Sequence, residues 1–280
     1  MILDGHIHIT HQFKNENGFT GTLKKSGIDG GVCISLAPRE HSLPWEDRLK
    51  DLFLWIDGNP LLFPFYWVNP LDESAGEQIQ KAVELGVKGI KIICDSFYPG
   101  DEKALKIYDQ IASLNLPILF HSGILWDGKV SSEFNRPAGF EVLLDVPNLR
   151  FSMAHMGWPW TDEYLAVYGK FLNSRSAYSE ETPEMFIDTT PGTPEIYRNE
   201  ALTKLYGIGY DVADNVIFGS DSSTDNYNGE WVNNWIKLDN SIHRRNKVSE
   251  ETIGKSYHNN LLRFISGEKK QHKALKVGEN

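Results

Sequence analysis

Residues 87–123, VKGIKIICDSFYPGDEKALKIYDQIASLNLPILFHSG, hold one complete strand–helix–strand unit. The runs at 87–94 and 117–123 are apolar and short, as buried strands are. Between them, residues 101–115 begin with acidic side chains, which favour a helix N-terminus. The apolar side chains of this segment recur at helical spacing on one face, at Leu105, Tyr108, Ile111 and Ala112. The stretch therefore predicts two buried strands joined by an amphipathic helix.

The same kind of unit repeats along the whole chain. Eight β-rich runs begin at Ile2, Asp29, Leu61, Val87, Pro117, Leu149, Glu184 and Val216. Their mean spacing of about 31 residues matches one strand plus its crossover helix. Further helices are expected at 73–86, 231–243 and 250–264, from apolar periodicity and polar boundaries. Eight strands alternating with helices predict a parallel (β/α)₈ TIM barrel as one domain over residues 1–266, followed by a charged C-terminal tail over 267–280.

Composition limits the classes of partner. The 280 residues carry a formal net charge of −10, which disfavours binding to nucleic acid or to an anionic membrane surface. No apolar run approaches the roughly 18 residues of a membrane span, and the N-terminus lacks the features of a signal peptide. Two cysteines, both in predicted strands, fit a reducing compartment. We expect a cytoplasmic protein that acts on a small molecule, and the sequence leaves open whether copies of the chain assemble.

Histidines and one aspartate stand where the chemistry of a TIM barrel is found, at the carboxyl ends of its strands. His6 and His8 lie two residues apart in the first strand, so their side chains point to the same side. His121 ends the fifth strand, His155 the sixth and Asp221 the eighth. Each residue alone could be a structural polar group. Together they predict a site for a divalent metal, with Zn²⁺ first and Mn²⁺ or another first-row metal as alternatives.

The order of the segments DGHIHI, GIK, FHSG, AHMG and FGSD resembles the amidohydrolase superfamily, and within it the amidohydrolase-related family of TIM-barrel hydrolases and decarboxylases. The resemblance covers almost the whole chain, up to HNNLLRF near its end. It implies that His6 and His8 bind the metal together with His121 and Asp221. It also implies that His155 hydrogen-bonds the metal's water or the substrate in one-metal members, and binds metal in two-metal members.

Four further residues are candidates for the site. Lys91, in the fourth strand, resembles the carboxylated lysine that bridges two metals in other superfamily members, but it could instead anchor a substrate carboxylate. We predict one metal and an unmodified Lys91. Trp126 and Trp158 lie just beyond strand ends and could wall an apolar ligand, although such indoles also seal barrel rims. Arg136 could hold a carboxylate through two hydrogen bonds, or form a surface ion pair.

The predicted reaction is hydrolysis of a lactone, amide or ester-like bond by a metal-activated water. Asp221 would take the proton of the water, and His155 would orient it or stabilise the charge that develops. The alternative is a metal-dependent decarboxylase of an aromatic or unsaturated acid, for which Trp126, Trp158 and Arg136 would serve. A barrel that only binds a ligand is a third hypothesis. The polar segment 222–230 is expected to be an open, mobile loop, which favours a reaction that consumes water.

Overall fold

A computed structural model describes residues 1–11, 18–38, 43–56, 58–179 and 181–269. Its strands form one parallel sheet in which each of the first eight strands pairs with its neighbour in the sequence, and the ninth pairs with the first. The strands are β1 (Leu3–His8), β2 (Gly30–Ile34), β3 (Leu62–Trp67), β4 (Gly89–Ile92), β5 (Pro117–Phe120), β6 (Arg150–Met153), β7 (Glu184–Asp188), β8 (Val216–Ile217) and β9 (Ser222–Ser223). The predicted parallel sheet is confirmed.

The ring closes through the last predicted strand, which the structure divides into two short pieces. β8 pairs with β7, whereas β9 pairs with β1. Between the pieces, the amide of Gly5 donates to the carbonyl of Phe218 at 2.8 Å, and the amide of Asp221 donates to the carbonyl of His6 at 2.9 Å. These hydrogen bonds carry the contact across the break. The fold is the (β/α)₈ TIM barrel that the sequence predicts.

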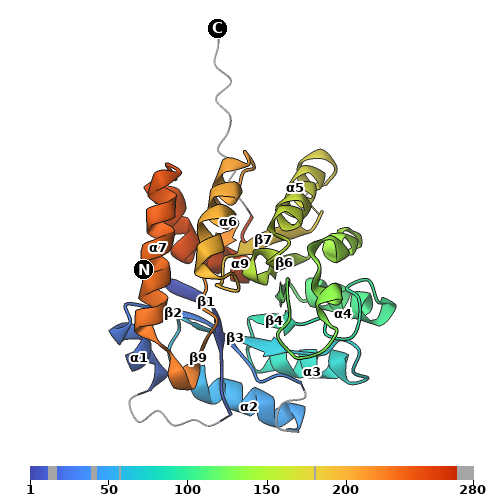
Figure 1. Cartoon of the computed structure of the whole chain (residues 1–280). Helices are drawn as coiled ribbons and strands as arrows, with labels where there is room; N and C mark the ends of the chain where they lie inside the picture. Colours follow the sequence, from blue (N-terminus) through green and yellow to red (C-terminus); the bar gives the residue numbers. More distant parts are fainter. Residues whose placement is uncertain (12–17, 39–42, 57, 180, 270–280) are drawn as a thin grey trace.

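Helices surround the strands (Figure 1). They are α1 (Phe19–Lys25), α2 (Trp45–Ile56), α3 (Ala75–Glu84), α4 (Glu102–Ser113), α5 (Thr161–Ala177), α6 (Glu195–Gly207), α7 (Gly229–Arg245), α8 (Glu250–Gly254) and α9 (Asn260–Ser266). A π-helical turn joins α8 to α9, so the predicted helix at 250–264 is present as one continuous helical segment. Between β5 and β6 the chain forms two 3₁₀ helices, Ser132–Asn135 and Pro137–Asp145.

Alternation along the strands separates an inner core from an outer one. In β4, Ile90 and Ile92 pack in the outer core under the helices, so Lys91 between them faces the barrel interior. In β1, Ile7 packs outward in the same way, which turns His6 and His8 inward. The inner core is apolar below these side chains and is completed by Leu261 and Phe264 of α9. Packed apolar side chains therefore fill one end of the barrel interior, and polar side chains line the other end.

The C-terminal boundary is only partly described. α9 ends at Ser266, and Gly267 takes a left-handed conformation with φ 75°. Residues 270–280 lie outside the described residues, so a separate tail from 267 stays a prediction. In the part of the chain that the structure covers, no helix has both the length and the apolar character needed to cross a membrane.

Candidate metal centre

Three of the predicted ligands converge at the carboxyl end of the barrel. The Nε2 atoms of His6 and His8 lie 3.2 Å apart. Oδ1 of Asp221 lies 3.5 Å from Nε2 of His6 and 3.4 Å from Nε2 of His8. His6 is fully buried, whereas the side chain of Asp221 is 38% exposed. The donors thus sit between a buried strand and an open cavity.

Local backbone geometry produces this convergence. His6 and His8 share the inner face of β1, because Ile7 between them faces outward. Asp221 follows β8 in a left-handed conformation with φ 59°, which is uncommon for a residue with a Cβ. Its amide donates to the carbonyl of His6, and this holds the turn against β1.

The spacing of the three donor atoms fits one small metal ion. Zn²⁺ binds nitrogen and oxygen at about 2.0–2.1 Å, so two donors of a tetrahedral site lie about 3.3–3.4 Å apart. The observed separations of 3.2, 3.4 and 3.5 Å agree with that edge length. Two imidazoles and a carboxylate are also a donor set typical of zinc. The residues present therefore fit a divalent metal.

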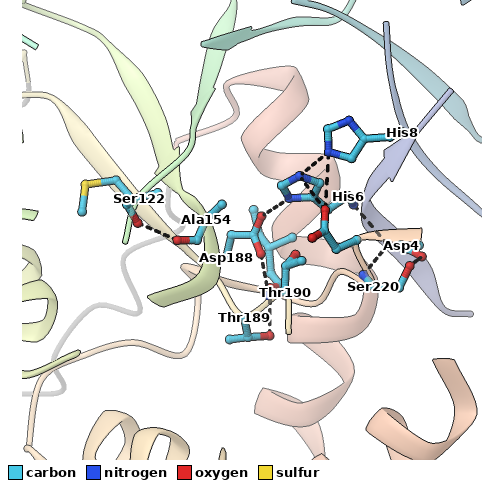
Figure 2. A network of polar contacts seen from close by, with 12 residues as sticks. Asp4, His6, His8, Ser122, Ala154, Asp188, Thr189, Thr190 and Ser220 are labelled. Atoms are coloured by element: carbon cyan, nitrogen blue, oxygen red, sulfur yellow. Dashed lines mark hydrogen bonds and ion pairs between the residues drawn. The ribbon is translucent and has the colours of Figure 1, made fainter. Parts of the chain in front are cut away.

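Asp188 supports His6 from behind and was not predicted from the sequence. Its Oδ2 accepts a hydrogen bond from Nδ1 of His6 at 3.0 Å, and its Oδ1 accepts one from the amide of Thr190 at 2.6 Å (Figure 2). This bond places the proton of His6 on Nδ1 and leaves Nε2 free to bind metal. Asp188 ends β7, so the strand-end rule that selected the histidines could have found it.

A buried carboxylate, Asp4, joins the two strands that carry the donors. It accepts hydrogen bonds from the amide of His6 at 3.1 Å, the amide of Ser220 at 2.8 Å and the hydroxyl of Tyr227 at 2.8 Å. The Ser220 hydroxyl donates to the same carboxylate (Figure 2). Burial raises the pKa of Asp4 to about 6, although the hydrogen bonds from Ser220 and Tyr227 oppose the rise. Sequence reasoning missed Asp4, whose position two residues before His6 was the available signal.

His121 and His155 lie beside the three donors but not among them. The ring of His155 is 5.5 Å from that of His6 and 5.0 Å from that of His121, measured between centroids. Nε2 of His121 lies 3.2 Å from the carbonyl of Ile124, to which it donates, so Nδ1 keeps the lone pair. His155 takes a left-handed conformation with φ 61°. Both rings line the same cavity as the three donors.

The electrostatics keep the imidazoles of His6, His121 and His155 neutral and the carboxylate of Asp221 ionised near neutral pH. Burial lowers the pKa of His155 to about 4 and holds the pKa values of His6 and His121 below the usual range. Burial opposes ionisation of Asp221, yet the hydrogen bond from His8 and the nearby His6 and His155 lower the pKa of its carboxyl. Neutral imidazole and ionised carboxylate are the forms that bind metal.

Lys91 enters the same cavity from β4. It is 1% exposed. Burial lowers the pKa of its ammonium to about 8, and the charges of Asp188 and Asp221 limit the decrease. The predicted position of Lys91 beside the histidines therefore agrees with the structure, while its chemical role stays a prediction.

The cavity has a volume of about 450 Å³, within the range of small-molecule sites. Trp67, Trp126 and Trp158 form part of its wall, and Trp126 is 80% exposed at the rim. Arg136 is not among the described residues that line it. The Nε of Arg136 instead donates to Glu163 at 2.9 Å, and its guanidinium lies over the ring of Trp160. The surface ion pair, one of the two alternatives for Arg136, is what the structure contains, and a substrate contact from this position is not supported.

The segment 222–230 is anchored rather than open. Ser222 and Thr224 are buried, and Tyr227 is 8% exposed with its hydroxyl bound to Asp4. Asn228 caps α7 by accepting a hydrogen bond from the amide of Trp231. The expectation of an open loop is wrong at these buried positions, because Thr224 and Tyr227 bind partners far away in the sequence, whereas the mobility of the segment stays a prediction.

The chain is similar to a known protein family over most of its length. A family model described as amidohydrolase matches residues 48–264, a range that includes His121, His155 and Asp221 but begins after His6 and His8. No curated protein matches the chain.

Solved structures share the fold. A dihydroorotase from Campylobacter jejuni is 16% identical with a TM-score of 0.57, and the match covers 96% of this chain and 84% of that one. An amidohydrolase 2 from Bifidobacterium longum subsp. infantis is 15% identical with a TM-score of 0.57, over 94% and 98% of the two chains. A dihydropyrimidinase from Brevibacillus agri is 11% identical with a TM-score of 0.64, over 94% and 70%. At these identities the likeness shows the fold alone.

Proposed function

The chain belongs to the amidohydrolase family, whose members are generally metal-dependent, and we propose that it is a hydrolase that cleaves a lactone, amide or ester-like bond in a small molecule. The observation that carries the proposal is the spacing of Nε2 of His6, Nε2 of His8 and Oδ1 of Asp221, which is within about 0.2 Å of the edge of a tetrahedral metal site. The site opens on a cavity with room for a small substrate.

We assign the metal to His6, His8 and Asp221, with His121 or His155 as the nearest further donors. Among the described residues, this is the one group of three potential ligands whose donor atoms all lie within 4.8 Å of one another. The proposal is therefore one metal per chain, Zn²⁺ by its donor set, and an unmodified Lys91. When bound, a divalent metal lowers the pKa of its water to about 7 and polarises an oxygen of the substrate.

The protein's own groups supply the remaining chemistry. Asp221 is ionised and partly open to the cavity, so its carboxylate can accept the proton of the attacking water and deliver it to the leaving group. His155 is neutral and lines the cavity near Asp221, where it can orient the water or donate to the developing oxyanion. Asp188 fixes the ring of His6 for this arrangement.

One residue on which the decarboxylase alternative depends is not available to the substrate. Trp126 and Trp158 line the cavity, but Arg136, which would have held the departing carboxylate, is bound to Glu163. The anchored segment 222–230 also removes the argument that an open loop favours hydrolysis. The preference for hydrolysis therefore rests on the matching family model, which is described as amidohydrolase, and on Asp221, which can pass a proton from a water at the metal site to a leaving group.

The first test is the double variant His6→Ala/His8→Ala. We expect the purified variant to hold no stoichiometric metal and to lack activity, while circular dichroism shows a folded barrel. Asp221→Asn should lose several orders of magnitude in kcat even where metal remains, because an amide cannot accept the proton. Metal retained at wild-type stoichiometry in the double variant would disprove the assignment.

The reaction type is tested on a panel of lactones, small amides and aromatic acids. Hydrolysis in ¹⁸O-labelled water should place the label in the carboxylate of the product. Release of CO₂ from aromatic acids, with no labelled product from any lactone or amide, would establish the lyase instead.

A further inference from the structure

The ammonium of Lys91 lies buried in the wall of the cavity. The side chain is 1% exposed and lines the cavity, yet no hydrogen bond or ion pair joins its Nζ to any of the residues that the structure describes. The two carboxylates whose charge acts on it are engaged elsewhere. Asp188 accepts from His6 and Thr190, and Asp221 faces His6 and His8.

A buried charge without a partner is costly for the protein. The cost is offset when a ligand supplies the missing anion, so a free ammonium facing a cavity favours an anionic ligand. Lys91 is the one lysine or arginine among the described residues that line this cavity. Arg136, the other cation considered, is paired with Glu163 outside it.

The other residues that line the cavity indicate the chemistry of the part of the ligand that does not contact Lys91. Trp67, Trp126 and Trp158 present indole rings to the cavity. The ring of Trp67 also packs against that of His8, at 5.9 Å between centroids, so this apolar wall is continuous with the metal donors. Ile93, Ile124 and Leu125 add aliphatic surface. Such a wall suits an aromatic or otherwise apolar body.

We propose that Lys91 keeps a free ammonium and binds a carboxylate of the substrate, so that the substrate is a small carboxylic acid with an aromatic or apolar body. The inference rests on the proposed function, because the scissile lactone or amide would lie at the metal donors while a second group, the carboxylate, reaches Lys91. The carboxylate is not altered in the reaction. Lys91 thereby selects acids over neutral molecules of the same shape.

Binding is measured first, because it does not depend on turnover. The zinc-loaded full chain is titrated by calorimetry with 3-phenylpropanoate and with 3-phenylpropanol, which differ at the acidic end. Lys91→Met should weaken binding of the acid about 10- to 100-fold, the usual effect of losing a hydrogen bond to a charged group. Lys88→Met, an exposed lysine in the same segment, is the matched control and should bind the acid as wild type does. Equal affinity of Lys91→Met and wild type for the acid would overturn the proposal.

Kinetics then separate an anchor from a catalytic group. N-acetylphenylalanine and N-acetylphenethylamine share the amide and the aromatic ring, and only the first carries a carboxylate. We expect wild type to prefer the acid in kcat/KM, and Lys91→Met to lose that preference through KM. An equal fall in kcat for both probes would place Lys91 at the reacting carbonyl and overturn the proposal. If wild type hydrolyses neither probe nor any lactone, the proposed hydrolysis fails while the calorimetric result still decides the role of Lys91.

Two controls address folding and modification. Lys91→Arg keeps the charge and should retain more of the acid binding than Lys91→Met. Zinc stoichiometry should stay at one in both variants, since Lys91 is not assigned to the metal. A ¹³C carbamate signal on Lys91 after growth with labelled bicarbonate, with loss of metal in Lys91→Met, would show a bridging lysine and refute the anchor.

Discussion

His6 uses its two ring nitrogens for different tasks. Nδ1 donates to Asp188, and Nε2 faces His8 and Asp221. Both His6 and Asp188 are buried, so this pair is shielded from water and holds one ring orientation. Burial opposes ionisation of Asp188, but the hydrogen bond from His6 holds the pKa of its carboxyl below the usual range. A carboxylate behind a metal-binding histidine raises the basicity of the ligand as well as orienting it.

Asp188→Asn tests this support at the scale of one residue. The amide keeps the shape and an acceptor for His6, but it loses the negative charge. We expect zinc affinity, measured by competition with a chromophoric chelator, to fall about 10- to 100-fold. Asp145→Asn, at an exposed position, is the control and should bind zinc as wild type does. Unchanged affinity in Asp188→Asn would mean that the contact with His6 is structural only.

The sequence was sufficient to identify site residues that each stand at the end of a single predicted strand. His6, His8, His121, His155 and Asp221 were identified because the carboxyl ends of barrel strands meet at one mouth, and the structure places all five at one cavity. The long-range partner of Arg136 could not be identified in this way. Glu163 lies 27 residues from Arg136, and no local pattern distinguishes an ion pair on the rim from a contact with substrate.

At the scale of elements, the junction of β1 with β8 and β9 holds the donors in register. Asp4 in β1 accepts from Ser220, just before Asp221, and from Tyr227 in the segment that follows. One buried carboxylate therefore connects the first strand to the last and fixes the turn that carries Asp221. The segment after β8 is anchored for the same reason.

Tyr227→Phe removes one hydrogen bond from this junction and little volume. We expect a loss of about 1.5–3 kcal/mol in the free energy of unfolding, the usual range for a hydrogen bond to a charged group. Urea titration of the zinc-free protein measures it. Tyr178→Phe, at a tyrosine that is 82% exposed, should leave the midpoint unchanged. A midpoint for Tyr227→Phe equal to that of wild type would show that Asp4 does not depend on the hydroxyl.

The sequence predicted the strands and four helical segments, namely α3, α4, α7 and the segment from α8 to α9, because their periodicity is local. It did not predict the division of the eighth strand into β8 and β9 or the anchoring of 222–230. The anchoring depends on Asp4, which lies 223 residues from Tyr227 in the chain. A polar segment without periodicity resembles an open loop until its buried partner is known.

At the scale of the whole molecule, buried neutral histidines couple stability to pH. Away from the metal centre, His243 of α7 is 3% exposed, and its Nδ1 has no hydrogen-bond partner among the described residues. Its ring packs edge-on against Tyr206, with centroids 5.1 Å apart. Burial lowers the pKa of His243, and Arg198 adds to the decrease while Asp239 opposes it.

The sign of the pH effect follows from that shift. A histidine whose folded pKa lies below its unfolded value of about 6.5 contributes stability above that pH, and the contribution is lost as pH falls. His243→Phe removes the proton-binding group. Between about pH 8 and about pH 5 the variant should therefore lose less stability than wild type. Urea unfolding at both pH values measures the difference, and identical pH dependence in the two proteins would contradict the prediction.

The metal should also stabilise the entire barrel, because its proposed ligands come from the first strand and from the turn after the eighth. His6 and His8 belong to β1, and Asp221 follows β8, so a bound ion links the strands at which the barrel closes. A ligand that binds only the folded state at a hundred times its Kd adds about 2.7 kcal/mol, which for a chain of this size raises Tm by roughly 5 °C. Differential scanning calorimetry with and without zinc measures the rise. His11→Ala, three residues beyond His8, should keep the full zinc response, whereas His6→Ala/His8→Ala should fold and show none. A wild-type rise in the double variant would place the metal at another site.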